Sequence, residues 1–276
     1  MNILVTGSEG FIGSHLVRAL RVNHNVLSMD KKSDSSTSNK ELLFSVVQEN
    51  QIDTIVHLGA NCSSQISLRA PHTDFIDNVV GTFNVCEAAR IFGCNIIFNS
   101  SMKVHRGEDG IISPYGASKQ FGEDYLDMYH RIYGIDYVIN RPSSVYGPGQ
   151  NGSDDGGFVT WLIKASLSNQ VVTLYGDGGQ SRDILYIDDH IELLVEQIEN
   201  FSHWKNDIYE FGGGIRNEVT LNQILDVLNY HKTQTAPYLP GDVYRFVCDN
   251  NKVREKGWSP RTLWTEGIKK TVEYFR

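Results

Sequence analysis

The stretch TGSEGFIG at residues 6–13 follows a short apolar run, residues 2–6, that has the pattern of a buried strand. Its glycines fall at positions 7, 10 and 13, and a helical pattern of apolar residues follows them. In such a unit the first glycine permits a tight turn, the second lets the backbone approach a pyrophosphate, and the third lets the helix pack closely on the strand. Unpaired N–H groups at the helix N-terminus then face the anion. We therefore expect a dinucleotide-binding unit here, rather than a glycine-rich turn without a ligand.

A second predicted strand, residues 25–29, is followed by Asp30. An acidic residue at this point accepts hydrogen bonds from the adenosine ribose of NAD, and it disfavours the 2′-phosphate of NADP. Lys31 and Lys32 come next and would offset part of that charge. The sequence therefore favours NAD and leaves NADP open.

Strand and helix patterns then alternate along the chain. Further strands are expected at residues 53–58, 95–99 and 136–140, and helices after a capping box formed by Ser38 and Glu41, over residues 71–92 and over residues 115–133. This alternation predicts an α/β fold with a doubly wound parallel sheet covered by helices on both faces. Ligands bind beyond the carboxyl ends of the strands in such sheets. The residues that fall at those ends are Gly7, Asp30, Gly59, Ser101 and Ser144.

Shorter elements replace the regular alternation after about residue 150. We therefore expect an NAD-binding, Rossmann-like domain over residues 1–165, with a returning segment near residues 180–200. Residues 166–276 are expected to form a smaller C-terminal α/β lobe that binds the substrate.

Tyr115 and Lys119 lie in the predicted helix over residues 115–133. Residues at positions i and i+4 share one helix face. An ammonium one turn away favours the phenolate, so we expect the pKa of Tyr115 to fall from its usual value of about 10. Such a Tyr can exchange a proton with a sugar hydroxyl, although the pair alone is a weak signal.

Composition excludes several other classes. The 276-residue chain carries a net charge of −8 and no basic run, which argues against nucleic-acid binding. No apolar run approaches the ~20 residues of a membrane span, and the N-terminus lacks the charged region of a signal peptide. The four cysteines show neither CxxC nor metal-ligand spacing, so we expect no metal site and reduced thiols in a cytoplasmic protein.

Several motifs occur together in one order from residue 3 to about residue 190. They are TGSEGFIG (6–13), HLGA (57–60), NVVGT (78–82), SS (100–101), YGASK (115–119), RPSSVYGPGQ (141–150) and GDGGQSRD (176–183). No single motif is decisive, but the ordered set resembles the extended short-chain dehydrogenase/reductase family, in particular its nucleotide-sugar epimerases and dehydratases.

Carried over by position, the resemblance implies that Tyr115 is the catalytic acid/base and that Lys119 binds the nicotinamide ribose and lowers the pKa of Tyr115. Ser101 would hydrogen-bond the reacting sugar hydroxyl, and Arg182 would clamp the diphosphate of the substrate, which suits a planar guanidinium. The implied NAD-binding residues are Gly7, Gly10, Phe11, Ile12, Gly13, Asp30, Leu58, Gly59, Ala60, Asn78 and Lys119. The implied substrate-binding residues are Ser101, Ser144 and Arg182.

The chain departs from the family pattern at several places. Residues 31–52 are short and lack a clear third strand, and the segment of residues 102–114 is short as well. The dehydratases of the family carry an Asp-Glu pair where this chain has Met102 and Lys103, which argues against elimination of water. His105 replaces a common Tyr, and Leu239 stands where many relatives carry a diphosphate-binding Arg, for which Arg245 is a candidate substitute.

The resemblance thus implies an NAD-dependent nucleotide-sugar epimerase that oxidises its substrate transiently to a keto-sugar, with Tyr115 as acid/base. Inversion at C4 is the commonest outcome among look-alikes. A CDP-sugar-type 2-epimerase is the alternative indicated by residues 101–104 and 211–214. An NAD(P)H-dependent nucleotide-sugar reductase and a catalytically silent cofactor-binding protein also stay open, as do the nucleotide and the sugar.

The family usually forms homodimers through a four-helix bundle. Here the corresponding helices would be residues 72–92 and 115–133. An outer apolar stripe would be supplied by Phe121, Tyr125, Met128 and Tyr129, unless these side chains pack on their own sheet.

Overall fold

The structure is a computed structural model that describes residues 1–106, 110, 112–153, 156–238 and 243–276. The chain divides into two compact units. The first comprises residues 1–104, 113–141 and 191–209, and the second comprises residues 105–112, 142–190 and 210–276. None of the helices in the described part of the chain has the length and apolar character of a membrane span.

A six-stranded sheet organises the first unit, with the strand order β10-β5-β4-β3-β1-β2. Strands β2, β1, β3, β4 and β5 pair in parallel, in register from Leu4 beside Leu27 to Phe98 beside Ile139. The predicted doubly wound parallel sheet is therefore confirmed. The strands are β1 (Asn2–Thr6), β2 (Asn25–Met29), β3 (Thr54–His57), β4 (Asn95–Asn99), β5 (Tyr137–Pro142) and β10 (Asp207–Phe211).

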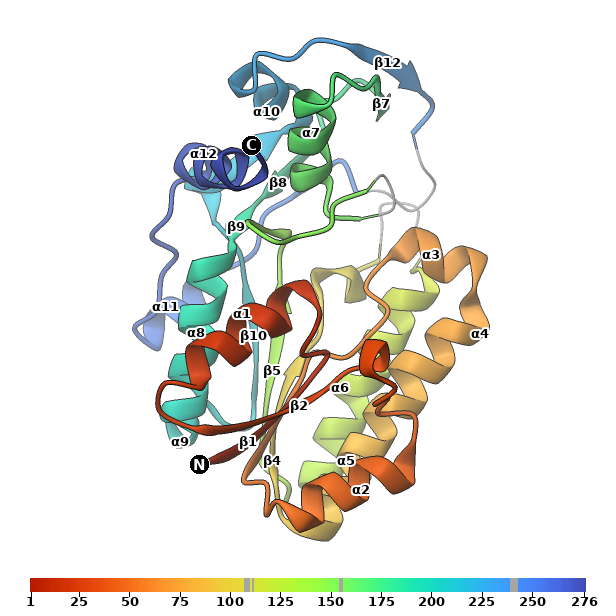
Figure 1. Ribbon diagram of the computed structural model, residues 1–276, viewed down its shortest axis with the longest axis vertical. Coiled ribbons are helices and arrows are strands. Elements are labelled where there is room, and N and C mark those ends of the chain that lie inside the picture. The colour runs from red at the N-terminus through yellow and green to blue at the C-terminus, as the bar shows by residue number, and fades with distance from the viewer. Residues whose placement is uncertain (107–109, 111, 154–155, 239–242) are drawn as a thin grey trace. The chain divides into compact units, whose positions relative to one another are not determined.

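Helices cover both faces of this sheet. Figure 1 shows α1 on one side of the strands and α2, α5 and α6 on the other. The core between α2, α5, α6 and the sheet is aliphatic and aromatic, with Leu43, Val85 and Phe98 fully buried. The helices are α1 (Phe11–Leu20), α2 (Lys40–Glu49), α3 (Ser64–Arg69), α4 (Pro71–Asp74), α5 (Gly81–Phe92), α6 (Pro114–Tyr133), α8 (Ile187–Glu199) and α9 (Phe201–Trp204).

The predicted element ends agree closely with the structure where a glycine stops a helix. Gly93 and Gly134 follow α5 and α6 in the left-handed conformation that glycine adopts without strain. The capping box predicted for Ser38 is wrong: Asn39 caps α2 by accepting a hydrogen bond from the Leu42 N–H, while Ser38 bonds Ser36. Residues 31–53 hold one short 3₁₀ turn and α2 but no strand, as expected.

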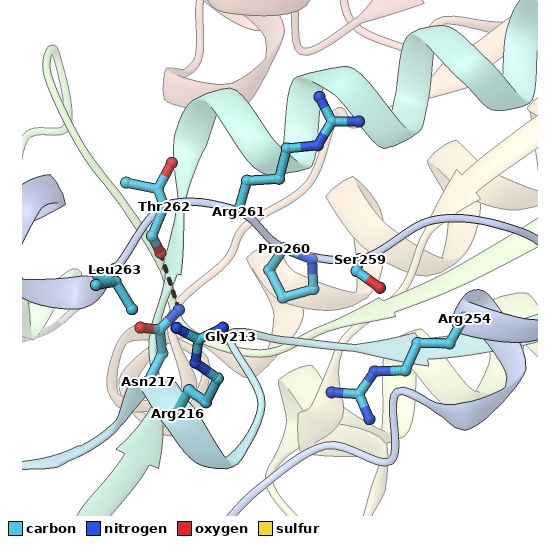
Figure 2. A pocket seen from close by; sticks show the side chains of 9 residues that line it. All are labelled: Gly213, Arg216, Asn217, Arg254, Ser259, Pro260, Arg261, Thr262 and Leu263. Carbon is cyan, nitrogen blue, oxygen red and sulfur yellow. Dashed lines mark hydrogen bonds between the residues drawn. The ribbon is translucent and has the colours of Figure 1, made fainter.

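Short sheets and helices make up the described part of the second unit. Strand β8 is central to a three-stranded sheet of order β11-β8-β13, and β12 pairs with β7 and β6 with β9. A pocket of about 190 Å³ opens beside the 3₁₀ turn of Ile215–Asn217 (Figure 2). The elements are β6 (Val145–Tyr146), β7 (Val172–Tyr175), β8 (Ser181–Asp183), β9 (Leu185–Tyr186), β11 (Glu218–Thr220), β12 (Thr233–Ala236), β13 (Arg245–Phe246), α7 (Phe158–Leu167), α10 (Leu221–Val227), α11 (Asn251–Glu255) and α12 (Trp264–Phe275).

The compact units divide the chain earlier than residue 165, because residues 142–165 group with the second unit. The chain leaves the parallel sheet at the end of β5, Pro142, and turns into the short strand β6. The segment that returns to the first unit spans residues 191–209, somewhat later than the 180–200 expected from the sequence.

Candidate active site

The glycine turn between β1 and α1 is as tight as the sequence predicts. Gly7 has a φ of +68°, and a Cβ there would lie 2.7 Å from the backbone nitrogen of Gly59. A Cβ on Gly13 would lie 2.0 Å from the Gly7 carbonyl oxygen, so only glycine permits this approach of helix and turn. Gly10 precedes α1 without a side-chain cap, which leaves the first N–H groups of the helix for an anion. These features fit the pyrophosphate of a dinucleotide.

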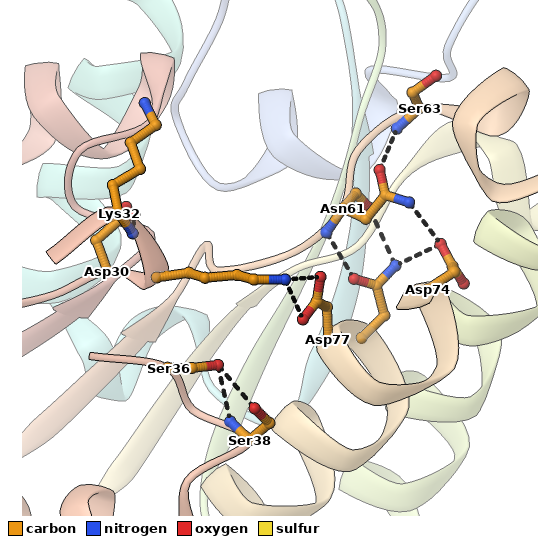
Figure 3. A network of polar contacts seen from close by, with 10 residues as sticks. Asp30, Lys32, Ser36, Ser38, Asn61, Ser63, Asp74 and Asp77 are labelled. Carbon is orange, nitrogen blue, oxygen red and sulfur yellow. Dashed lines mark hydrogen bonds and ion pairs between the residues drawn. The ribbon is translucent and has the colours of Figure 1, made fainter. Parts of the chain in front are cut away.

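Asp30 lies at the carboxyl end of β2, beside the glycine turn (Figure 3). Its carboxylate accepts hydrogen bonds from the backbone N–H of Glu9 and of Lys32, both at 2.9 Å. A carboxylate has about four acceptor sites, so capacity remains for ribose hydroxyls. The two lysines are engaged elsewhere: Lys31 pairs with Asp77, and the Lys32 ammonium donates to the Glu9 carbonyl.

His57 ties the next strand end to the turn. Its Nδ1 lies 2.7 Å from the Thr6 hydroxyl and its Nε2 3.1 Å from the Thr82 hydroxyl. Complete burial lowers the pKa of His57 to about 3, so the ring is neutral. Thr6 also accepts a hydrogen bond from the Gly59 N–H, and this fixes the segment Leu58–Gly59–Ala60 beside Gly7. The sequence motif gave no hint of this link between β1, β3 and α5.

Asn78 is at the centre of a buried polar network. Its amide oxygen accepts from the Asn61 N–H at 2.7 Å, and its amide nitrogen lies 3.0 Å from acceptors on Asn61, Asp74 and Ser118. Figure 3 shows Asn61 and Asp74 facing each other across this network. Because Ser118 lies on α6 between Tyr115 and Lys119, Asn78 anchors the active-site helix. Its contact with the cofactor stays a prediction.

Ser101, Tyr115 and Lys119 come together at the carboxyl end of β4. Helix α6 begins with Ser113, whose hydroxyl accepts from the Gly116 N–H, and this places Tyr115 in its first turn. The Tyr115 hydroxyl lies close enough to Ser101 for the serine side chain to lower the pKa of Tyr115. The Lys119 ammonium donates to the Asn99 carbonyl at 2.8 Å. All three are nearly buried, with relative exposures of 8% for Ser101, 7% for Tyr115 and 4% for Lys119.

The pKa of Tyr115 shifts in the opposite direction to the sequence-based expectation. Burial raises it above its usual value, the nearby Cys62 thiol adds to the rise, and the Ser101 side chain opposes it. Burial also lowers the pKa of Lys119 to about 8, so Lys119 is a weaker cation than an exposed lysine. The expected lowering of the Tyr115 pKa by Lys119 is therefore wrong for the protein without bound cofactor, because the cost of burying the phenolate outweighs the effect of the Lys119 charge.

Glu123 and Arg141 form an ion pair next to this site. Neither was predicted from the sequence as a functional residue. Glu123 lies one turn beyond Lys119 on α6 and is buried, and it forms a two-point ion pair with Arg141 at the end of β5. It also accepts a hydrogen bond from the hydroxyl of Ser100, the neighbour of Ser101. A carboxylate on the inner face of a helix was the available signal, since it needs a buried partner.

The second unit holds two of the three substrate residues expected from the sequence, Ser144 and Arg182. Ser144 is half-buried, and its carbonyl accepts from the Leu185 N–H. Arg182 is buried on β8, where it donates to the carbonyls of Ser181 and Tyr244. Binding of substrate by either residue stays a prediction.

Asp183 is a further residue that the sequence analysis did not single out. It is fully buried and accepts from the Ser143 hydroxyl at 2.6 Å and from the N–H groups of Gly214 and Cys248. It thus joins three other segments of the second unit. Asp183 follows Arg182 in the sequence, and its partner Ser143 precedes Ser144. Burial raises its pKa, and these three hydrogen bonds oppose the rise.

The structure describes the contacts of two of the residues at which the chain departs from the family pattern, His105 and Arg245. Leu239 lies outside the described residues. Arg245 forms a two-point ion pair with Glu218, at 2.6 and 2.8 Å, so a role at a diphosphate would require it to leave that partner. His105 pairs with Glu210 at 2.6 Å and packs on the ring of Phe246. Among the described residues no cluster of three or more His, Cys, Asp or Glu side chains could hold a metal ion.

Comparison with known proteins gives a consistent result. A model of the NAD dependent epimerase/dehydratase family matches residues 3–212. A UDP-glucose 4-epimerase of Mycolicibacterium smegmatis is 32% identical, covering 100% of this chain and 99% of the relative. A CDP-paratose 2-epimerase of Salmonella typhi is 27% identical, covering 99% of each.

Solved structures extend the likeness to the whole fold. The UDP-glucose 4-epimerase of Thermotoga maritima with UDP-glucose superposes with a TM-score of 0.91 at 31% identity, covering 100% of this chain and 99% of that one. The UDP-glucose 4-epimerase of Thermus thermophilus in complex with NAD gives a TM-score of 0.89 at 30% identity, with the same coverage.

Proposed function

Because the chain belongs to the NAD-dependent epimerase/dehydratase family, we propose that it is a nucleotide-sugar 4-epimerase with NAD as its cofactor. The observation that carries the proposal is the convergence of Ser101, Tyr115 and Lys119 at the strand end that also faces the glycine turn. UDP-hexoses are the first substrates to test, since the relative from Mycolicibacterium smegmatis is a UDP-glucose 4-epimerase and the solved structure from Thermotoga maritima contains UDP-glucose.

The side chains divide the work as follows. Tyr115 takes the proton from the sugar hydroxyl during oxidation and returns it during reduction, and Ser101 holds that hydroxyl by sharing a hydrogen bond with Tyr115. Lys119 holds the nicotinamide ribose. Bound NAD supplies the oxidant and a positive charge that favours the Tyr115 phenolate. Between oxidation and reduction the keto-sugar rotates in the site, so the hydride returns to its opposite face and the configuration at C4 is inverted.

Elimination of water is disfavoured by the residues after Ser101. Met102 is buried and uncharged and Lys103 is basic, so neither supplies the carboxyl group that the dehydratases of the family carry at this place. This supports an epimerase within the family.

The direct test is an assay with UDP-glucose and UDP-galactose. An epimerase interconverts them with no net change in reduced-nicotinamide absorbance, whereas a reductase consumes NADH or NADPH steadily. Tyr115→Phe is expected to lower kcat by ~10²–10⁴-fold while NAD binding persists. Near-normal turnover by this variant would remove Tyr115 from the mechanism.

A CDP-sugar 2-epimerase is the second candidate, favoured by the relative from Salmonella typhi and by the residues Met102, Lys103 and Val104 after the serine. Mass spectrometry of nucleotides that co-purify with the protein, followed by NMR of the turnover product, separates inversion at C2 from inversion at C4.

We also propose a homodimer through α5 and α6. Tyr125 stacks between Phe121 and Tyr129, with ring centroids 4.1 and 5.9 Å away. Tyr129 is buried and donates to Glu87, so this part of the expected outer stripe packs within the protein. Met128 is partly buried and packs against the core of the first unit, so Phe121, which is also partly buried, is the remaining candidate for contact with a partner. Sedimentation at micromolar concentration tests the proposal, and a monomer throughout would exclude it.

A further inference from the structure

Three arginines line the pocket in the second unit that Figure 2 shows. The pocket measures about 190 Å³. Arg216 comes from the 3₁₀ turn before β11, Arg254 from α11 and Arg261 from the segment before α12. No acidic side chain is among the lining residues, although the protein as a whole carries a net charge of −8. The pocket shares no residue with the predicted NAD and substrate sites.

Two of these guanidinium groups are not neutralised within the described chain. Among the described residues, Arg216 and Arg254 have no hydrogen-bond or ion-pair partner for their side chains. Two carboxylates next to these segments are already engaged: Asp189 accepts from Thr262, and Glu218 pairs with Arg245. Arg261 differs from the other two, since its guanidinium is directed away from them (Figure 2).

The frame of the pocket is held rigidly. Asn217 donates to the Thr262 carbonyl at 3.0 Å and accepts from the Trp264 N–H at 2.8 Å, which ties the two lining segments together. The guanidinium of Arg254 abuts the backbone at Gly214, where a Cβ would lie 3.5 Å from its Nη2. Gly214 has a φ of +68°. The hydroxyl of Ser259 adds a further donor among the lining residues.

These features select the class of ligand. Guanidinium groups bind phosphate oxygens through charge-assisted hydrogen bonds, and a rigid frame lowers the ordering cost of binding. A volume of 190 Å³ corresponds to about six water molecules at roughly 30 Å³ each, which suits a phosphate, a pyrophosphate or a small sugar phosphate but not a whole nucleotide sugar. We propose that this arginine pocket binds the phosphate group of a small anion, separately from the NAD and nucleotide-sugar sites.

Calorimetric titration of the NAD-loaded protein with pyrophosphate at low ionic strength tests the proposal. We expect one saturable site per chain. Arg216→Ala and Arg254→Ala should each weaken binding by about 10-fold or more, the effect of losing a hydrogen bond to a charged group. Arg21→Ala is the matched control, because it removes one exposed arginine at the end of α1, in the first unit, that is not among the residues that line the pocket. It should leave the affinity unchanged.

Two further arms define the ligand. Orthophosphate and a hexose 1-phosphate, titrated in the same way, distinguish a free phosphate from a phosphate ester, and dependence on Arg216 and Arg254 in either case supports the site. Saturation with UDP-glucose should not displace the anion. The proposal is overturned if pyrophosphate fails to bind at millimolar concentration, binds both arginine variants as tightly as the wild type, or is displaced by UDP-glucose. Because none of these readouts uses turnover, failure of the proposed epimerase activity would leave the result intact.

Discussion

The ammonium of Lys119 donates a hydrogen bond to the backbone carbonyl of Asn99 at 2.8 Å and lies 4.8 Å from the centre of the Phe98 ring. This contact joins the active-site helix α6 to the end of β4, one residue before Ser100 and two before Ser101. It also keeps a lysine 4% exposed, so folding removes its charge from water. A group held in this way makes the stability of the protein depend on pH.

The first prediction concerns that dependence. The pKa of Lys119 is about 8 in the folded protein and 10.5 when unperturbed, so between these values the unfolded chain binds a proton that the folded chain does not. Stability should therefore rise with pH from about 8 toward 10, by up to about 1.4 kcal/mol per pH unit from this group. Lys119→Met should remove this part of the slope in urea unfolding. Lys269→Met, at an exposed site on α12, should retain it, and equal slopes in both variants would contradict the argument.

Gly13 provides the second prediction. Gly13→Ala drives a Cβ to within 2.0 Å of the Gly7 carbonyl oxygen, which must displace the turn or α1 at roughly 1–3 kcal/mol. We expect lower stability together with a large loss of NAD affinity in a fluorescence titration. Gly93→Ala is the control: it has a φ of +77° and nothing within 4 Å of a Cβ, so it should cost about 1–2 kcal/mol of stability and leave NAD binding intact.

The fold was largely predictable from the sequence, because strand ends and glycine stops are local signals. The predicted spans of β1, β2 and β4 agree with the structure to the residue. Competition between adjacent residues was not predictable in this way. Ser38 and Asn39 are both good caps, and Asn39 caps α2 because the Ser38 hydroxyl bonds Ser36 instead.

Contacts between distant residues were the main part of the site that the sequence could not predict. The spacing of Tyr115 and Lys119 predicts that they share one helix face, but it does not predict how far they are buried from solvent. Burial sets the direction of both pKa shifts. Glu123 finds Arg141 on the next strand, and Asp183 finds Cys248 across 65 positions of sequence. Such pairings exist only once the chain has folded.

Asp183 provides the third prediction. Asp183→Asn replaces one of the acceptor oxygens that serve Ser143, Gly214 and Cys248 by a donor, which should cost about 1–3 kcal/mol. Since Arg182 and Ser144 flank these contacts in the sequence, we expect KM for the nucleotide sugar to rise more than kcat falls, with NAD affinity unchanged. Ser143→Ala keeps both backbone bonds and should have a smaller effect. A drop in kcat alone would show that Asp183 does not position the substrate residues.

Glu123 provides the last prediction. Its side chain is 2% exposed and pairs with Arg141, which is itself 19% exposed, so removing the carboxylate takes the negative charge of Glu123 away from a largely buried cation. Loss of one partner of a buried pair costs about 3–5 kcal/mol, and Glu123→Gln, which retains one acceptor, should reach the lower part of that range. Asp127→Asn is the control on the same helix: its pair with Arg131 is exposed, and its loss should cost less than about 1 kcal/mol. Because Ser100 donates to Glu123, the variant should also lower kcat by loosening the strand end that carries Ser101. Equal unfolding midpoints for Glu123→Gln and Asp127→Asn would contradict the prediction that the Glu123–Arg141 pair stabilises the fold.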